Sequence, residues 1–171
     1  LQPFIPHYRE EFFSLLGRRL KEKNVGQSFE QEIYTFERTK DVKSASFNMS
    51  NISCKHIQSM LIKGKLLVYN PFKLLHKENE VLVLMLHFAH ISTWLLLLTK
   101  RLHHKKIILW GQGISVRRYL KEEKKPDWKL KWMMALADGV WLYMEKEKEQ
   151  WQKLFPQKPM VALNNTLTGV D

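Results

Sequence analysis

Two kinds of hydrophobic pattern alternate along the chain. The first is a short apolar run with little polar interruption, which is typical of a strand buried on both faces of a parallel sheet. Such runs, or strand-like segments close to them, lie at 65–70, 81–86, 107–110, 139–144 and 159–165. The second is a longer stretch with helical character, found at 91–106, 127–138 and 145–155. This alternation of strands and helices predicts repeated βαβ units.

The first third of the chain is less regular. Residues 1–5 are expected to form the end of a first strand. Residues 10–23 predict an amphipathic helix, with Pro6 before it and Gly26 after it. Residues 32–39 predict a strand, whereas the polar segment 40–56 is expected to be a loop or an edge region.

These elements predict an α/β fold class. We expect a Rossmann-like, three-layer α/β/α domain with a mostly parallel central sheet. The length of 171 residues fits a single domain that spans 1–171.

Residues 81–98 are long and apolar enough to raise the alternative of a membrane span. Two histidines, a serine and a threonine interrupt the segment, and the apolar runs on each side are short. A buried strand, a turn and a buried helix, the latter starting near residue 91, explain the pattern better. A solvated turn is expected at 103–106, where two histidines precede two lysines.

Charge is the strongest compositional signal. Lys and Arg outnumber Asp and Glu by 28 to 17, which gives a net charge of +11 and favours phosphate-bearing partners. The run 117–131 holds seven basic and three acidic residues, with aromatic residues between them. It indicates a solvated surface, peripheral contact with an anionic membrane, or a nucleic-acid surface. No nucleic-acid motif accompanies it, so the membrane is favoured over nucleic acid, which is not an expected partner.

Cysteine usage points to a reducing compartment. Cys54 is the only cysteine, so neither an intrachain disulfide nor a cysteine-based metal site is possible. The expected location is cytoplasmic, with peripheral attachment at the inner face of the membrane.

Polar residues follow the predicted strands, and ligands of open parallel sheets bind beyond the carboxyl ends of the strands. The candidates are His7, Tyr8 and Arg9 after 1–5; His87 and His90 after 81–86; Gly111, Gln112, Gly113, Arg117 and Arg118 after 107–110; Tyr143 near the end of 139–144; and Asn165 at the end of 159–165. The glycines at 111 and 113 fit either a plain turn or close approach of the backbone to a ligand. The two histidines lack the partners of a usual metal set, so no metal site is expected.

Several sequence motifs are absent. The chain has no GxGxxG, no GxxxxGK[ST] and no GxSxG. A dinucleotide site of the usual kind, a nucleoside triphosphatase and a nucleophile-elbow hydrolase are therefore disfavoured.

Four segments, taken in order, resemble a known family. They are "FIPHYREEFFSLLGRRL", "KKIILWGQGISVRR", "LADGVWLYMEKEKEQWQKLFP" and "MVALNNTL". They are similar to the strand ends and helices of the N-terminal domain of GT-B glycosyltransferases of the family-4, retaining type. The match covers most of the chain and is weakest over 27–63.

The resemblance implies half of a GT-B fold, the acceptor side, with the C-terminal donor-binding domain outside this chain. The full enzyme would transfer a sugar from a nucleoside diphosphate sugar to a hydroxyl of a glycan or lipid-linked acceptor in cell-surface polysaccharide biosynthesis. It would need no metal, this half would hold no cofactor, and this half alone would be inactive. The implied acceptor-binding residues are His7, Tyr8, Arg9, Gly111, Gly113, Arg117, Arg118, Tyr143 and Asn165.

Catalytic roles are not implied clearly. Gln112 stands where the family has His, and an amide cannot act as a general base near neutral pH. Gln112 and His87 are the candidates for a catalytic role. The alternative is a non-catalytic Rossmann-like module that binds an anionic ligand or nucleic acid.

Overall fold

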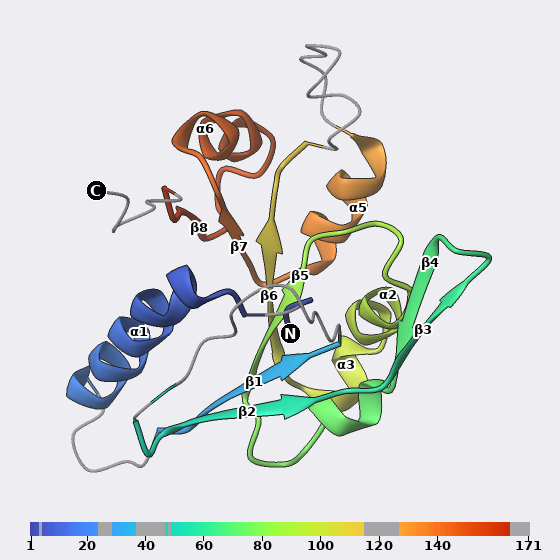
Figure 1. Ribbon diagram of the computed structural model, residues 1–171. Helices are drawn as coiled ribbons and strands as arrows, with labels where there is room; N and C mark the ends of the chain where they lie inside the picture. Colours follow the sequence, from blue (N-terminus) through green and yellow to red (C-terminus); the bar gives the residue numbers. More distant parts are fainter. Residues whose placement is uncertain (4, 24–28, 37–46, 48, 115–126, 165–171) are drawn as a thin grey trace. The chain divides into compact units, whose positions relative to one another are not determined.

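The computed structural model describes residues 1–3, 5–23, 29–36, 47, 49–114 and 127–164. They form two compact units, one within 1–59 and the other within 60–164, and each unit is described by itself (Figure 1). The expectation of a single domain over 1–171 therefore stays a prediction.

The first unit is built on a small parallel sheet. Strands β1 (Gln31–Thr35) and β2 (Ile52–His56) pair in parallel, and Gln2 forms a parallel bridge to Thr35. A short 3-10 helix, η1 (His7–Arg9), leads into α1 (Glu10–Lys23), which confirms the helix predicted at 10–23.

Of the two alternatives for 40–56, a loop or an edge region, the second fits 52–56, which form the exposed strand β2 of a two-stranded sheet. Only Ile52 of that strand is buried, and its other residues are exposed. A strand with one buried residue carries no apolar run, so the hydrophobic pattern could not show it. The strand predicted at 32–39 is β1, and residues 37–39 lie outside the described residues.

The second unit centres on four parallel strands, which lie in the sheet in the order in which they occur in the chain. These are β5 (Val81–Met85), β6 (Lys106–Gly111), β7 (Gly139–Leu142) and β8 (Met160–Ala162). Their inward side chains are fully buried at Ile107, Leu109 and Leu142. The connecting helices are α2 (Ile91–Leu98) with α3 (Lys100–His103), α5 (Trp128–Leu136) and α6 (Glu145–Leu154). The predicted βαβ alternation is confirmed.

The strand order fixes where the helices lie. Crossovers between parallel strands are almost always right-handed. Three successive right-handed crossovers between strands in sequential order place their helices on the same face of the sheet. The helices α2, α5 and α6 therefore form one layer, and α2 and α5 contact each other within it.

A strand pair flanks the helix layer. Strand β3 (Ser59–Ile62) pairs with β4 (Leu66–Tyr69) across a tight turn, and the 3-10 helix η2 (Pro71–Leu74) follows (Figure 1). Tyr69 ties β4 to the buried side of α2, because its N–H donates to Ser92 Oγ at 3.0 Å and its hydroxyl lies 2.8 Å from Thr93 Oγ1.

The apolar segment 81–98 divides into β5, a turn and α2, as predicted. Within the described ranges, none of the helices has the length and apolarity needed to cross a bilayer. The helix expected over 91–106 breaks at Thr99 and ends at His103, and His104 has a left-handed φ of 57°.

The turn at 103–106 is not simply solvated, so that expectation is corrected. Lys105 is buried, and its Nζ donates to the carbonyl oxygens of His76 and Asn79, each at 2.6 Å. The left-handed residue directly before Lys105 ends the helix, and the lysine holds the turn before β5 against the start of β6.

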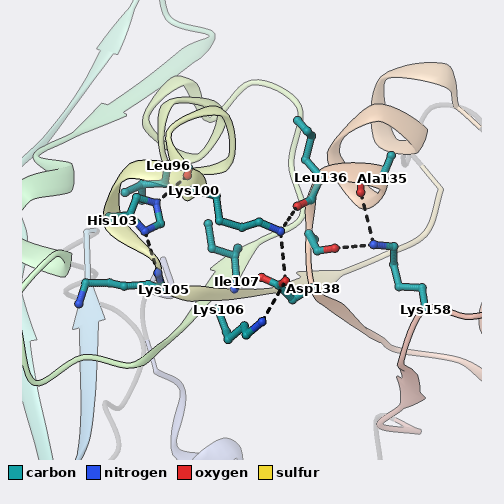
Figure 2. A network of polar contacts seen from close by, with 11 residues as sticks. Leu96, Lys100, His103, Lys105, Lys106, Ile107, Ala135, Leu136, Asp138 and Lys158 are labelled. Carbon is teal, nitrogen blue, oxygen red and sulfur yellow. Dashed lines mark hydrogen bonds and ion pairs between the residues drawn. The ribbon is translucent and has the colours of Figure 1, made fainter.

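A polar network holds the amino ends of β6 and β7 (Figure 2). The Asp138 carboxylate accepts the N–H of Ile107 at 2.9 Å and lies 3.1 Å from Lys100 Nζ. Lys100 Nζ also donates to the carbonyl of Leu136 at 2.8 Å. Asp138 thus joins the start of β6 to Lys100 of α3, and Lys100 in turn bonds to the end of α5. This network lies at the amino edge of the sheet.

The fold is mixed α/β with mostly parallel sheets, and it is consistent with a Rossmann-like α/β fold, as the sequence predicted. That the chain is half of a GT-B fold stays a prediction.

Candidate functional site

The carboxyl ends of the four parallel strands form one edge. The register pairs Met85 with Trp110, Gly111 with Leu142, and Leu142 with Ala162, so neighbouring strands end within a residue or so of each other. Adjacent strands lie about 4.8 Å apart. The predicted shared edge is therefore confirmed for the tips at 87–90, 111–113 and 143, and Asn164 follows β8 at the same edge.

Two histidines form the tip after β5. Their rings stack, with centroids 4.8 Å apart, and His87 also stacks on Phe88 at 5.4 Å. His87 is exposed on one side, and His90 is buried. Burial, and then the neighbouring His87, lowers the pKa of His90 to about 4. Burial against its neighbours also lowers the pKa of His87. Both rings are therefore neutral at neutral pH and can donate or accept hydrogen bonds.

The two glycines after β6 are required by packing against the protein itself. A Cβ on Gly111 would lie 3.0 Å from Leu86 Cβ, and one on Gly113 would lie 2.5 Å from Trp151 Nε1. Of the described glycines, only Gly64 has a positive φ. The close neighbours of these two glycines are side chains of this chain, and close approach to a ligand stays a prediction.

Helix α6 holds the backbone of Gly113 from two sides. Trp151 Nε1 donates to the carbonyl of Gly113 at 2.8 Å, and the Glu147 carboxylate accepts the N–H of Gly113. Burial raises the pKa of the Glu147 carboxyl, and three backbone N–H groups that donate to it, from Gly113, Met144 and Tyr143, oppose that rise. The loop after β6 is therefore fixed to the helix that follows β7.

The remaining tips are more accessible. Gln112 is exposed between the two packed glycines, and Tyr143 is half-buried after β7. Asn164 is exposed and has a positive φ of 41°. Gln112, His87 and Tyr143 thus offer an amide, an imidazole and a phenol along three neighbouring strands. These groups suit hydrogen bonding to hydroxyls of a neutral ligand.

The other predicted site residues belong to the first unit or lie outside the described residues. His7, Tyr8 and Arg9 form η1 in the first unit, where Arg9 Nη1 donates to Gln2 Oε1 at 2.8 Å. Arg117, Arg118 and Asn165 lie outside the described residues. Whether any of these residues binds an acceptor stays a prediction.

No group of three or more potential metal ligands occurs in the part of the chain that the structure describes.

Sequence reasoning missed the roles of Glu147 and Trp151. Glu147 occupies the third position of α6 after the N-cap Met144, and a glutamate there is known to accept the N-cap N–H. Only the glutamate of that capping pattern is present in the sequence, because the N-cap is Met144 instead of Ser or Thr. The bond of Trp151 to Gly113 spans 38 positions and leaves no local signal.

Comparisons with known proteins identify no relatives. A scan against protein-family models finds no match, and neither a curated protein nor a solved structure matches the chain.

Proposed function

We propose that this chain is the acceptor-side half of a GT-B glycosyltransferase of the family-4, retaining type. The full enzyme transfers a sugar from a nucleoside diphosphate sugar to a hydroxyl of a glycan or lipid-linked acceptor. The observation that carries the proposal is the alignment of His87, Gln112 and Tyr143 along the carboxyl edge of one parallel sheet. Open parallel sheets bind ligands at that edge.

The motif positions support the same proposal. The segment "IILWGQG" forms β6 and the loop after it, and "ADGVWL" covers the end of α5 and β7. In this chain the aspartate of the second motif braces the amino edge, while the loop of the first motif lies at the carboxyl edge. The second motif thus stabilises the sheet, and the first motif contributes Gln112 to the proposed acceptor site.

The chemical task of this half is orientation of the acceptor. Gln112 can donate to one hydroxyl and accept from another. Neutral His87 can donate from Nε2, because its Nδ1 already accepts the N–H of Ala89 at 3.2 Å. Neither is proposed as a strong base. Holding the acceptor hydroxyl in reacting geometry lowers the barrier by removing orientational freedom before the reaction.

The test compares the 171-residue chain with the longer protein encoded through the region after residue 171. The longer protein should carry a second Rossmann-like domain and transfer sugar from one of a panel of nucleoside diphosphate sugars, whereas the chain alone should not. Gln112→Ala in the longer protein should lower kcat/KM by about tenfold or more. Gln150→Ala, on the exposed side of α6, is the matched control and should leave kcat/KM unchanged.

A reading frame that ends at residue 171 would overturn the proposal, and so would equal activity of both variants. Tight binding of the chain to nucleic acid, with a steep dependence on salt, would support the non-catalytic alternative instead.

A further inference from the structure

The solvent side of α2 and α3 is apolar, which reverses the usual pattern of a surface helix. Ile91, Leu95, Leu98 and Leu102 recur at helical spacing and are all exposed, with Leu98 at 67% and Leu102 at 79%. The opposite side of α2 is buried and includes the residues that bond to Tyr69. The apolar stripe is therefore additional to the side that packs on the protein.

Helix α5 continues this apolar surface. Trp128 and Trp132 lie one turn apart and are 63% and 62% exposed, while Leu130, Met133 and Met134 are buried beneath them. Lys129 Nζ lies 4.6 Å from the centre of the Phe88 ring, which connects α5 to the turn before α2. We call the six exposed residues of both helices the apolar face: Ile91, Leu95, Leu98, Leu102, Trp128 and Trp132.

Helix α6 provides an internal comparison. It lies in the same layer over the same sheet, yet its exposed side carries Glu145, Lys146, Glu149 and Gln150. The exposure of apolar side chains is therefore a property of the apolar face and not of every crossover helix. Several large apolar side chains exposed on two helices that contact each other are typical of an interaction surface.

Basic residues outnumber acidic ones around the apolar face, although Lys100 is paired with Asp138 at 3.1 Å. Segments 91–103 and 128–136 contain no acidic residue, and they contain Lys100, Arg101, Lys129 and Lys131. Asp127 and Asp138 lie just beyond the ends of α5, and each accepts a backbone N–H. The surroundings of the apolar face therefore attract anions.

We propose that the apolar face docks on the surface of an anionic phospholipid bilayer. Leucine and isoleucine side chains would enter the boundary of the acyl chains, and the two tryptophans would lie at headgroup level, where their amphipathic rings are favoured. Arg101 and Lys131 are exposed and would contact lipid phosphates.

Charge argues against a second copy of this chain as the occupant. A symmetric pair would bring two identical basic surfaces together, and such like-charge contact is unfavourable. The proposal is also independent of sugar transfer, because none of its residues belongs to the proposed acceptor edge.

The experiment is flotation of the 171-residue chain with vesicles. One set is phosphatidylcholine, and the other contains about one third phosphatidylglycerol. The chain should float with the anionic vesicles and be released by high salt. Leu98→Gln with Leu102→Gln should lower the bound fraction by about tenfold. Leu154→Gln, an exposed leucine on α6, is the matched control and should bind like the unmodified chain.

Two further variants separate the contributions. Arg101→Gln with Lys131→Gln should remove most of the preference for anionic vesicles. Trp128→Phe with Trp132→Phe should retain binding but lose the blue shift of tryptophan fluorescence that vesicles produce. Circular dichroism checks that each variant is folded.

Absence of vesicle binding by the unmodified chain would overturn the proposal. Equal loss of binding in the Leu154 control would do the same. If sedimentation without lipid shows a dimer that the Leu98 and Leu102 substitutions dissociate, the apolar face is a protein interface instead.

Discussion

At the scale of single residues, Gly113 shows how a strand tip can look functional for a structural reason. It lies at the carboxyl edge, but its backbone is held by Trp151 and Glu147, and its missing side chain makes room for the indole. Gln112, its exposed neighbour, is the position of this loop that a ligand can reach.

We predict that Gly113→Ala lowers the free energy of unfolding by about 1–3 kcal/mol, since the added Cβ would overlap the Trp151 ring. Urea unfolding followed by circular dichroism measures the change. Gly139→Ala is the control, because its Cβ would meet no atom closer than 3.4 Å. The control should stay within about 0.5 kcal/mol of the unmodified chain. An equal effect of both substitutions would contradict the packing explanation.

Asp138 is the residue whose charge matters most to the sheet. Burial alone would raise the pKa of its carboxyl, but the N–H of Ile107 and the ammonium groups of Lys100 and Lys106 outweigh burial and hold the pKa below its usual value. A lowered pKa in the folded state means that the ionised carboxylate stabilises the fold at higher pH. That stability is present above the usual carboxyl pKa and is lost as the pH falls through the lowered value.

Asp138→Asn should therefore cost about 2 kcal/mol near neutral pH, and the difference from the unmodified chain should shrink below about pH 4. Urea unfolding across pH measures it. Asp127→Asn is the control, because asparagine caps a helix about as well as aspartate, and it should be nearly neutral. A cost for Asp138→Asn that does not change with pH would show that the charge is not responsible.

At the scale of elements, the sequence predicted most of the structure wherever a segment is buried on one side or both. The strands at 81–86 and 107–110 and the helices at 10–23 and 145–155 are visible because burial demands an apolar pattern. The sequence left strand β2 undecided between a loop and an edge region, because only Ile52 is buried. Lys105 was misjudged because its two carbonyl partners come from a turn almost thirty positions earlier.

The candidate site divides in the same way. The strands could be located in the sequence and expected to run in parallel, so His87, Gln112 and Tyr143 could be expected along one edge. The order of the strands in the sheet was not predicted. The partners of Gly113 could not, since they depend on a contact across 38 positions. The exposed apolar residues of α2 and α3 could not be predicted either. The sequence shows that a residue is apolar, but not whether its side of the helix faces the core or the solvent.

At the scale of the whole molecule, the two units differ in how well their strands are supported. The strands β6 and β7 have a neighbour on each side and fully buried side chains, whereas β1 and β2 form a two-stranded sheet in which β2 is largely exposed. Small sheets with little burial open more readily.

We predict that amide hydrogens of β6 and β7 exchange with deuterium at least about tenfold more slowly than those of β2. Exchange followed by mass spectrometry or nuclear magnetic resonance measures the rates. Strand β5, at the edge of the same sheet, is the internal control and should be intermediate. Equal protection of β2 and β6 would contradict the expected ranking.

The anchoring of Gly113 by Trp151 has a practical consequence. The indole of Trp151 donates a hydrogen bond to the carbonyl of Gly113, the residue directly after the exposed Gln112. A molecule that settles on the loop would alter the surroundings of this chromophore without touching it. We therefore expect the fluorescence of Trp151 to report occupancy of this loop without a label, once the emission of the other tryptophans is accounted for.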